Sequence, residues 1–303
     1  MIDVALLGTG GMMPLPRRWL SSLLLRVGGE VILCDCGEGT QIAWRATGWS
    51  FRRLSTICIS HTHADHIAGL PGLLHTVANT GRTEPLTIYG PPEVAAVVRG
   101  LRVIAPELPF PVEVRQLASG ETFPLPEGLR GSCVAGEHAL PVLAYRFDLA
   151  RRRRFLSDRA RELGVPVNRW HELQDGGSIT IAGRTVSPDE VLGPPRSGLS
   201  LAYVTDTRPT PAIAGLIAGA DLLVCEGTYG DDDDTEKAVR NQHMTFREAA
   251  TLARDAGARQ LWITHFSPGV TDAAAFVENA RTVFPDTAIG FDGMNASFAF
   301  PDR

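Results

Sequence analysis

The stretch "SHTHADHIAGLPGLL", residues 60–74, places three histidines and one aspartate within six positions, directly after an apolar run. That run, "STICIS" at 55–60, predicts a buried strand, and a helix is expected over 66–77. The loop between them carries four ligand-type side chains: His61, His63, Asp65 and His66. Imidazole and carboxylate groups are the usual ligands of zinc, so the loop predicts a metal site.

Four ligands so close together can scarcely all face one ion, which favours two ions side by side. A purely structural interpretation is less favoured, because it would place three nearly adjacent imidazoles on one loop with no function for them. Further ligands are expected at His138, Asp206 and His265, because each follows an apolar run, as His61 does. The complete prediction is His61, His63 and His138 on one ion, Asp65, His66 and His265 on the other, and Asp206 as the bridge. Such a pair activates water, so the predicted chemistry is hydrolysis.

Composition limits the class of protein. The chain has 303 residues, 44% hydrophobic and 21% charged, which suits one large α/β domain or two smaller ones. No apolar stretch reaches the roughly 18 residues that would predict a membrane span, and "MIDVALLGTGG" lacks the features of a signal peptide, so we expect a cytoplasmic protein. The five cysteines lie in strand-like runs and are expected to be reduced and buried. Cys34 and Cys36 form a C-x-C pattern, which we interpret as structural.

Apolar runs alternate with helix-like stretches through most of the chain, which predicts α/β layers around mixed sheets. Expected strands include 3–8, 22–26, 30–35, 55–60, 86–89, 199–206, 221–227 and 260–266, and expected helices include 39–46, 66–77, 92–100, 245–256 and 272–282. The segment 148–198 is different, with dense arginines followed by Gly and Pro, and is expected to be an insertion. The net charge of −5 excludes a uniformly basic surface, so any nucleic-acid contact must be regional. Arg151 to Arg154 fit either a solvated turn or a phosphate-binding patch.

The motif H-x-H-x-D-H resembles the metallo-β-lactamase superfamily, and the whole set of motifs resembles its RNase Z branch of tRNA 3′-trailer endonucleases. The set comprises "LLGTGGMMPLPRRWLSSLLLRV", "LCDCGEGTQ", "SHTHADHIAGLPGLL", "IYGPPE", "EHALPVLAYRF", "VTDTRP", "CEGTY", "HMTFREAA", "THFS" and "FDGM", in the family's order. The resemblance implies a four-layer αββα sandwich, with residues 1–303 forming one domain and 148–198 an arm-like segment inserted within it. It also implies two Zn²⁺ per chain and a homodimer.

The resemblance also assigns catalytic roles. Asp65 would act as general base on the attacking water, and His243, paired with Glu226, would protonate or stabilise the leaving oxygen. A carboxylate raises the pKa of a histidine, which supports the pairing. Iron-dependent redox members are expected to have a glutamate where this chain has Ala64, so zinc hydrolysis is favoured, with Mn²⁺ possible from ligand type. His75 and His171 are interpreted as structural.

The chain departs from the family pattern in three places: Trp19 stands near an expected asparagine, Asn168 and Arg169 replace Gly-Pro, and Gly269 replaces arginine. These lie in substrate-facing motifs, so two functions stay open. The first is a zinc-dependent endoribonuclease that removes 3′ trailers from precursor tRNA. The alternative is a phosphodiesterase of the same fold acting on small phosphodiesters or cyclic nucleotides. An RNA-binding scaffold without turnover is disfavoured because every expected ligand is present. No membrane partner is expected.

Overall fold

The computed structural model describes residues 1–301, which divide into two compact units. The larger unit contains Met1–Asp148 and Leu199–Ala299, and the smaller contains Leu149–Gly198 with Phe300 and Pro301. Across the described residues, the helices are too short or too polar to cross a membrane. The larger unit carries every residue predicted for the metal site.

The first sheet of the larger unit has seven strands and is mixed. Its order is β16 (Asn295–Phe298), β1 (Ile2–Gly8), β2 (Ser22–Val27), β3 (Glu30–Cys34), β4 (Leu54–Cys58), β5 (Leu86–Gly90) and β6 (Val112–Gln116). The strands β16, β1, β2 and β3 pair antiparallel, whereas β3 to β6 pair parallel. The parallel strands are therefore the ones whose carboxyl ends meet at one edge, where ligand sites collect.

The second sheet also has seven strands. Its order is β15 (Thr287–Ile289), β14 (Leu261–Thr264), β13 (Leu222–Glu226), β12 (Arg196–Val204), β9 (Leu143–Arg151), β8 (Leu129–Ala135) and β7 (Thr122–Pro124). The strands β12 to β15 run parallel. The two central ones, β13 and β14, are buried along their whole length, as expected for strands covered on both faces.

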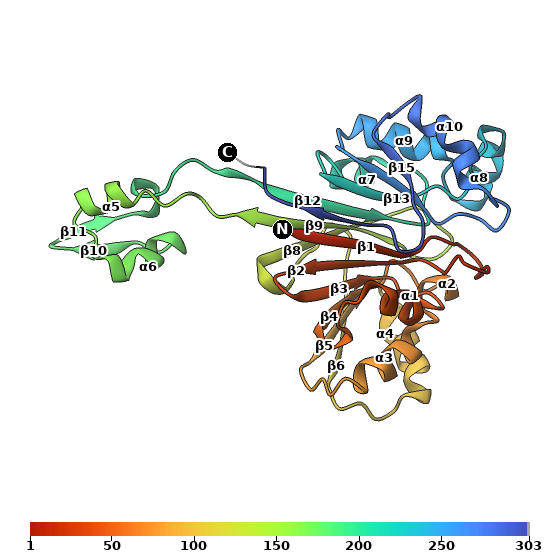
Figure 1. Cartoon of the computed structure of the whole chain (residues 1–303), viewed down its shortest axis with the longest axis horizontal. Coiled ribbons are helices and arrows are strands. Elements are labelled where there is room, and N and C mark those ends of the chain that lie inside the picture. Colours follow the sequence, from red (N-terminus) through yellow and green to blue (C-terminus); the bar gives the residue numbers. More distant parts are fainter. Residues whose placement is uncertain (302–303) are drawn as a thin grey trace. The chain divides into compact units, whose positions relative to one another are not determined.

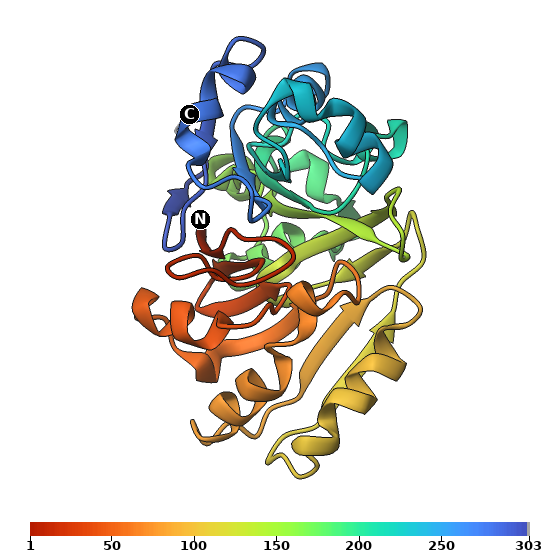
Figure 2. The ribbon, with the colours of Figure 1, turned by 90° about the vertical axis from the view of Figure 1, so that its right-hand side faces the viewer.

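Helices cover the outer face of each sheet, and the inner faces pack together (Figures 1 and 2). The first sheet is covered by α1 (Thr40–Thr47), α3 (Leu70–Ala78) and α4 (Val94–Leu101), and the second by α7 (Pro211–Leu216), α9 (Phe246–Asp255) and α10 (Val277–Arg281). Between the sheets, the Tyr145 hydroxyl of β9 donates to the Ile59 carbonyl at 2.7 Å, and the Tyr203 hydroxyl of β12 donates to Asp35 at 2.9 Å. The αββα sandwich expected from the sequence is therefore confirmed.

Helix α9 shows how the local sequence sets an element. Thr245 and Glu248 form a capping box, in which the Thr245 hydroxyl accepts the Glu248 N–H and the Glu248 carboxylate accepts the Thr245 N–H. Such a cap contributes about 1 kcal/mol. The face carrying Phe246, Ala249 and Ala253 is buried against the second sheet. The cap fixes where the helix starts, which in turn positions His243 two residues upstream.

The helix expected over 66–77 is divided into α2 (Ala64–Ile67) and α3 (Leu70–Ala78). Gly69 lies at the division, where a Cβ would fall 2.2 Å from the Gly37 carbonyl oxygen. The backbone of Gly69 also donates to the Cys36 carbonyl at 2.9 Å. Gly69 therefore lies directly against the backbone of Cys36 and Gly37, where a side chain would not fit.

The smaller unit has its own apolar core. It contains α5 (Ser157–Glu162), α6 (Trp170–Gln174) and a hairpin of β10 (Ile179–Ile181) and β11 (Arg184–Val186). The core includes Ala160, Val165, Leu173, Ile179, Val186 and Val191, all buried. Arg169, at a position where the family pattern has proline, makes two hydrogen bonds to Glu172 at 2.7 and 2.8 Å. Arg169 thus has a structural partner within this unit.

Candidate metal centre

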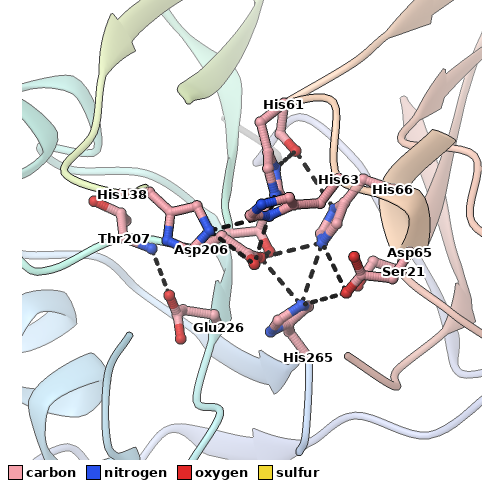
Figure 3. A network of polar contacts seen from close by, with 12 residues as sticks. Ser21, His61, His63, Asp65, His66, His138, Asp206, Thr207, Glu226 and His265 are labelled. Atoms are coloured by element: carbon pink, nitrogen blue, oxygen red, sulfur yellow. Dashed lines mark hydrogen bonds and ion pairs between the residues drawn. The ribbon is translucent and has the colours of Figure 1, made fainter. Parts of the chain in front are cut away.

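All seven predicted ligands lie on segments that follow strands of the two sheets, and the structure brings them together (Figure 3). His61 and His63 follow β4, and Asp65 and His66 lie on α2. The remaining three, His138, Asp206 and His265, follow β8, β12 and β14. Strands far apart in sequence thus supply one cluster of donors. The role of these side chains as ligands stays a prediction.

The first group of donors comprises His61, His63, His138 and Asp206, with one ligand atom of each within 4.8 Å of the others. His63 Nδ1 lies 2.9 Å from His61 Nε2 and 3.2 Å from His138 Nε2. Asp206 Oδ2 lies 3.7 Å from His61 Nε2 and 3.8 Å from His138 Nε2. Three imidazole nitrogens and a carboxylate oxygen that converge in this way fit a tetrahedral cation.

The second group comprises Asp65, His66, Asp206 and His265. His66 Nε2 and His265 Nε2 are 3.2 Å apart, and each faces Asp206 Oδ1, at 3.2 and 3.1 Å. Asp65 Oδ2 lies 3.5 Å from His66 Nε2 and 3.4 Å from His265 Nε2. The two oxygens of Asp206 therefore face different groups, which is the arrangement expected of a bridging carboxylate.

Two of these residues have unusual backbone conformations. Asp206 and His265 have φ angles of 49° and 59°, in the left-handed region that non-glycine residues seldom adopt. Each stands just after a buried parallel strand, where the turn directs the side chain toward the cluster. Strain of this kind costs on the order of 1–3 kcal/mol and gathers at functional sites.

The electrostatics of the donors suit a metal. Burial lowers the pKa of His61 well below its ordinary value, with a further decrease from His66, and burial also lowers the pKa of His138. Both imidazoles are therefore neutral near pH 7, the form that binds metals. Burial raises the pKa of Asp65, but His66 and His265 lower it more, so the carboxyl is ionised. Burial would lower the pKa of His66, but the charges of Asp206, Asp35 and Asp65 raise it. His61, His138 and Asp65 therefore have the neutral and ionised forms that zinc binds.

Asp35 orients His66, a role that the sequence pattern did not reveal. Asp35 is fully buried after β3, and its Oδ2 accepts hydrogen bonds from His66 Nδ1 at 2.8 Å and from the hydroxyls of Ser60 and Tyr203 at 2.8 and 2.9 Å. Its Oδ1 accepts the Ser60 N–H at 2.7 Å. With the proton of His66 on Nδ1, the Nε2 lone pair points into the cluster. Asp35 directly follows an apolar run, the same signal that identified Asp206.

Glu226 and His243 form a buried pair beside the cluster. Glu226 ends β13, and its carboxylate lies 3.2 Å from His243 Nδ1. Backbone N–H groups of Thr207 and Met244 also donate to this carboxylate, at 2.5 and 3.0 Å. Burial alone would lower the pKa of His243, but the charge of Glu226 raises it to about 9. His243 is therefore cationic at neutral pH, and its ring lies 5.1 Å from that of His138.

A loop near the N-terminus, residues 9–19, closes against the second donor group. The Met12 N–H donates to Asp65 Oδ2 at 2.6 Å. Gly11 lies so close to His265 that a Cβ there would be 2.5 Å from the imidazole. Asp292, in the "FDGM" motif, accepts hydrogen bonds from the N–H groups of Thr9 and Trp19, at 3.0 and 2.6 Å. The sequence did not assign this role to Asp292.

The remaining candidates lie outside the cluster. His75 Nε2 bonds the Ile104 carbonyl at 3.1 Å, consistent with a structural role, and His171 lies on α6 in the smaller unit. All five cysteines are buried and free, as expected from the sequence. Burial raises the pKa of both Cys34 and Cys36, which disfavours the thiolate form that a metal requires.

Comparison with known proteins identifies close relatives over the whole chain. The sequence is 44% identical to Ribonuclease Z of Lachnospira eligens over 303 residues and to Ribonuclease Z of Agathobacter rectalis over 302 residues, with all of each chain covered. Residues 146–266 match the family described as Beta-lactamase superfamily domain. Residues 2–100 match the family described as Anti-Pycsar protein Apyc1.

Solved structures show the same fold. Human tRNase Z, short form (ELAC1), has a TM-score of 0.71 at 24% identity, covering 98% of this chain and 100% of that one. The metallo-β-lactamase fold protein YhfI of Bacillus subtilis has a TM-score of 0.69 at 19% identity, covering 97% and 98%. Unliganded yeast PDE1 has a TM-score of 0.57 at 12% identity, covering 97% and 98%. These likenesses establish the metallo-β-lactamase fold.

Proposed function

The chain belongs to the ribonuclease Z family of the metallo-β-lactamase superfamily, and we propose that it is a metal-dependent endoribonuclease that removes 3′ trailers from precursor tRNA. The observation that carries the proposal is the pair of donor groups sharing Asp206, because two adjacent metal sites suit in-line displacement at phosphorus. Full-length relatives named Ribonuclease Z support the RNA substrate.

The proposed metals are two Zn²⁺ per chain, with Mn²⁺ as the alternative. One ion is assigned to His61, His63 and His138, the other to Asp65, His66 and His265, with Asp206 shared. When bound, such ions activate water near neutral pH and stabilise the charge that develops on the phosphate. The predominance of imidazole donors favours zinc over manganese.

Asp65 is the proposed general base. Burial raises its pKa but His66 and His265 lower it more, so the carboxylate is ionised and its oxygens can accept a hydrogen bond from water. The Met12 N–H bonds Oδ2, which fixes the rotation of the carboxylate and leaves Oδ1 free of that contact. A fixed carboxylate beside the ligands holds an attacking water in one orientation, which lowers the entropy cost of the reaction.

His243 is the proposed general acid. At neutral pH it carries a proton on each ring nitrogen, and Nδ1 is directed at Glu226, so Nε2–H is available to the leaving oxygen of the ribose. Glu226 maintains this cation through its charge and holds the ring in place. The pair therefore places an acid beside the donor cluster, with its ring 5.1 Å from that of His138 and 5.5 Å from that of His265.

The smaller unit, within the inserted segment 148–198, is the proposed RNA-binding arm of a single metallo-β-lactamase-fold domain spanning 1–303. It contains nine arginines against six acidic residues between positions 149 and 198. Arg153, Arg159 and Arg161 pair with acidic neighbours at 2.6–2.9 Å, so phosphate groups would have to compete for them. We further propose a homodimer that acts in the cytoplasm.

The paired arginines also favour the alternative function, hydrolysis of small phosphodiesters or cyclic nucleotides, because such substrates do not need the arm. Both functions use the same donors and the same Asp65. Only the tRNA function requires the chain to recognise RNA, with Asn168 and Gly269 at positions where the family pattern has other residues. The relatives at 44% identity favour the tRNA reaction.

The test is cleavage of a precursor tRNA with a 3′ trailer by zinc-loaded protein, with bis-p-nitrophenyl phosphate in parallel. A single cut beside the discriminator that leaves a 3′-hydroxyl, lost with chelator and restored by zinc, is the expected result. Hydrolysis of the small diester with intact RNA would overturn the tRNA assignment and support the alternative. Binding of RNA with neither activity would support a scaffold.

A further inference from the structure

Thr228 connects the two functional parts of the site. It lies two residues after Glu226 and is fully buried. Its hydroxyl oxygen is 2.7 Å from Glu226 Oε2 and 3.0 Å from His265 Nδ1. One hydroxyl therefore stands between the carboxylate that holds His243 and a proposed ligand of the second ion.

The direction of these two hydrogen bonds follows from counting protons. A threonine hydroxyl has one proton to donate and lone pairs to accept with. Glu226 already receives the N–H groups of Thr207 and Met244 as well as His243 Nδ1, so its oxygens act as acceptors. The hydroxyl proton is consequently directed at Glu226. The lone pair of Thr228 is then left to accept Nδ1–H from His265.

This arrangement selects one tautomer of His265. With the proton on Nδ1, the Nε2 lone pair faces Asp206 Oδ1 at 3.1 Å and Asp65 Oδ2 at 3.4 Å, where the second ion is assigned. The ring is held in this orientation because Gly11 lies against it, with space too small for even a Cβ. The opposite tautomer would direct a proton into the donor group and remove the lone pair that a metal needs.

We propose that Thr228 is a positioning residue that holds His265 in the metal-binding tautomer and links the second metal site to the Glu226–His243 pair. The inference rests on the proposed two-metal function and concerns how the second ion is retained. Loss of the hydroxyl leaves His265 free to exchange tautomers and leaves Glu226 with one donor fewer. The second ion should then bind more weakly while the first site is unchanged.

The experiment compares zinc binding by wild type, Thr228→Val and Thr228→Ser, measured by chelator competition and by metal analysis after dialysis. Valine has nearly the same shape without the hydroxyl, so we expect the second ion to bind about 10- to 100-fold more weakly, the range typical for loss of a residue that orients a ligand. Serine keeps the hydroxyl and should restore binding. Thr287→Val is a matched control, because that buried hydroxyl bonds only a backbone carbonyl, of Phe284, at 2.6 Å.

Wild-type affinity for both ions in Thr228→Val would overturn the proposal. If that variant does not fold, ¹⁵N-histidine spectra of zinc-loaded wild type decide the matter, since the proposal requires the proton of His265 on Nδ1 and a proton on Nε2 would contradict it. A failure of the proposed function can be told apart from a failure of the Thr228 proposal. Wild type that binds two ions but leaves precursor tRNA intact would end the tRNA assignment without affecting the zinc comparison.

Discussion

The carboxylate of Asp292 accepts the backbone N–H of Trp19 at 2.6 Å, across 273 positions of sequence. Its other oxygen accepts both the N–H and the hydroxyl of Thr9, at 3.0 and 2.8 Å. One side chain therefore anchors both ends of the loop that carries Arg17, Arg18 and the Met12 contact to Asp65. The loop over residues 9–19 is thus held by a residue from the far end of the described chain.

Replacing Asp292 by alanine should free this loop and leave two backbone N–H groups without their partner. We expect the free energy of unfolding to fall by about 2–4 kcal/mol, because unsatisfied buried donors are costly. We also expect the KM for precursor tRNA to rise more than that for bis-p-nitrophenyl phosphate. Thermal unfolding and steady-state kinetics check both points. Equal KM changes for the two substrates would show that the loop does not contribute to RNA recognition.

Replacing Asp65 by alanine should abolish cleavage while RNA binding persists. The proposed base and a ligand of the second ion are removed together, so the rate should fall by about 10²–10⁴-fold or more. Cleavage assays and electrophoretic mobility shifts measure the two properties separately. Unchanged cleavage by this variant would exclude Asp65 as the base.

The alkaline limit of activity should depend on Glu226. His243 faces Glu226 and Asp206 together with the imidazoles of His138, His66 and His265, and its pKa is about 9, so the acid is lost as the pH rises through that value. The Glu226→Gln variant lacks the negative charge that raises the pKa of His243, whereas burial and the neighbouring imidazoles still lower that pKa. The alkaline limb of kcat/KM should therefore move to lower pH by at least about one unit. A His243→Ala variant should lack this limb, and an unmoved limb in Glu226→Gln would contradict the assignment.

Replacing Asp35 by alanine should weaken the second metal site. His66 loses the acceptor that fixes its tautomer, so zinc affinity should fall by about 10- to 100-fold, and the buried groups of Ser60 and Tyr203 lose their partner. Chelator competition gives the affinity. Tyr203→Phe is the matched control, because it removes one donor to Asp35 but leaves the contact with His66. That control should lose about 1 kcal/mol of stability and no zinc affinity, and a comparable loss of affinity in both variants would point to general disruption.

Much of the fold was predictable because buried parallel strands are continuous apolar runs. The strand expected at 221–227 corresponds to β13 (Leu222–Glu226). The helix expected at 245–256 corresponds to α9 (Phe246–Asp255). The division between α2 and α3 was not predicted, nor was the approach of the Gly69 backbone to Gly37 that is found there. Local periodicity carries no signal for such a contact.

The sequence by itself determined the types of donor and their positions after strands, because a histidine or an acidic residue that follows an apolar run can be recognised from the order of residues alone. Only the tertiary structure decided how they are oriented. His66 and His265 meet at 3.2 Å although 199 positions separate them, and Thr228 has no charge to mark it in a motif. The tautomer of a histidine depends on which acceptor reaches its other nitrogen, and here those acceptors, Asp35 and Thr228, come from other strands. Those hydrogen bonds form only once β3 has paired with β4 and β13 with β14, and the two histidines meet only after the two sheets have packed.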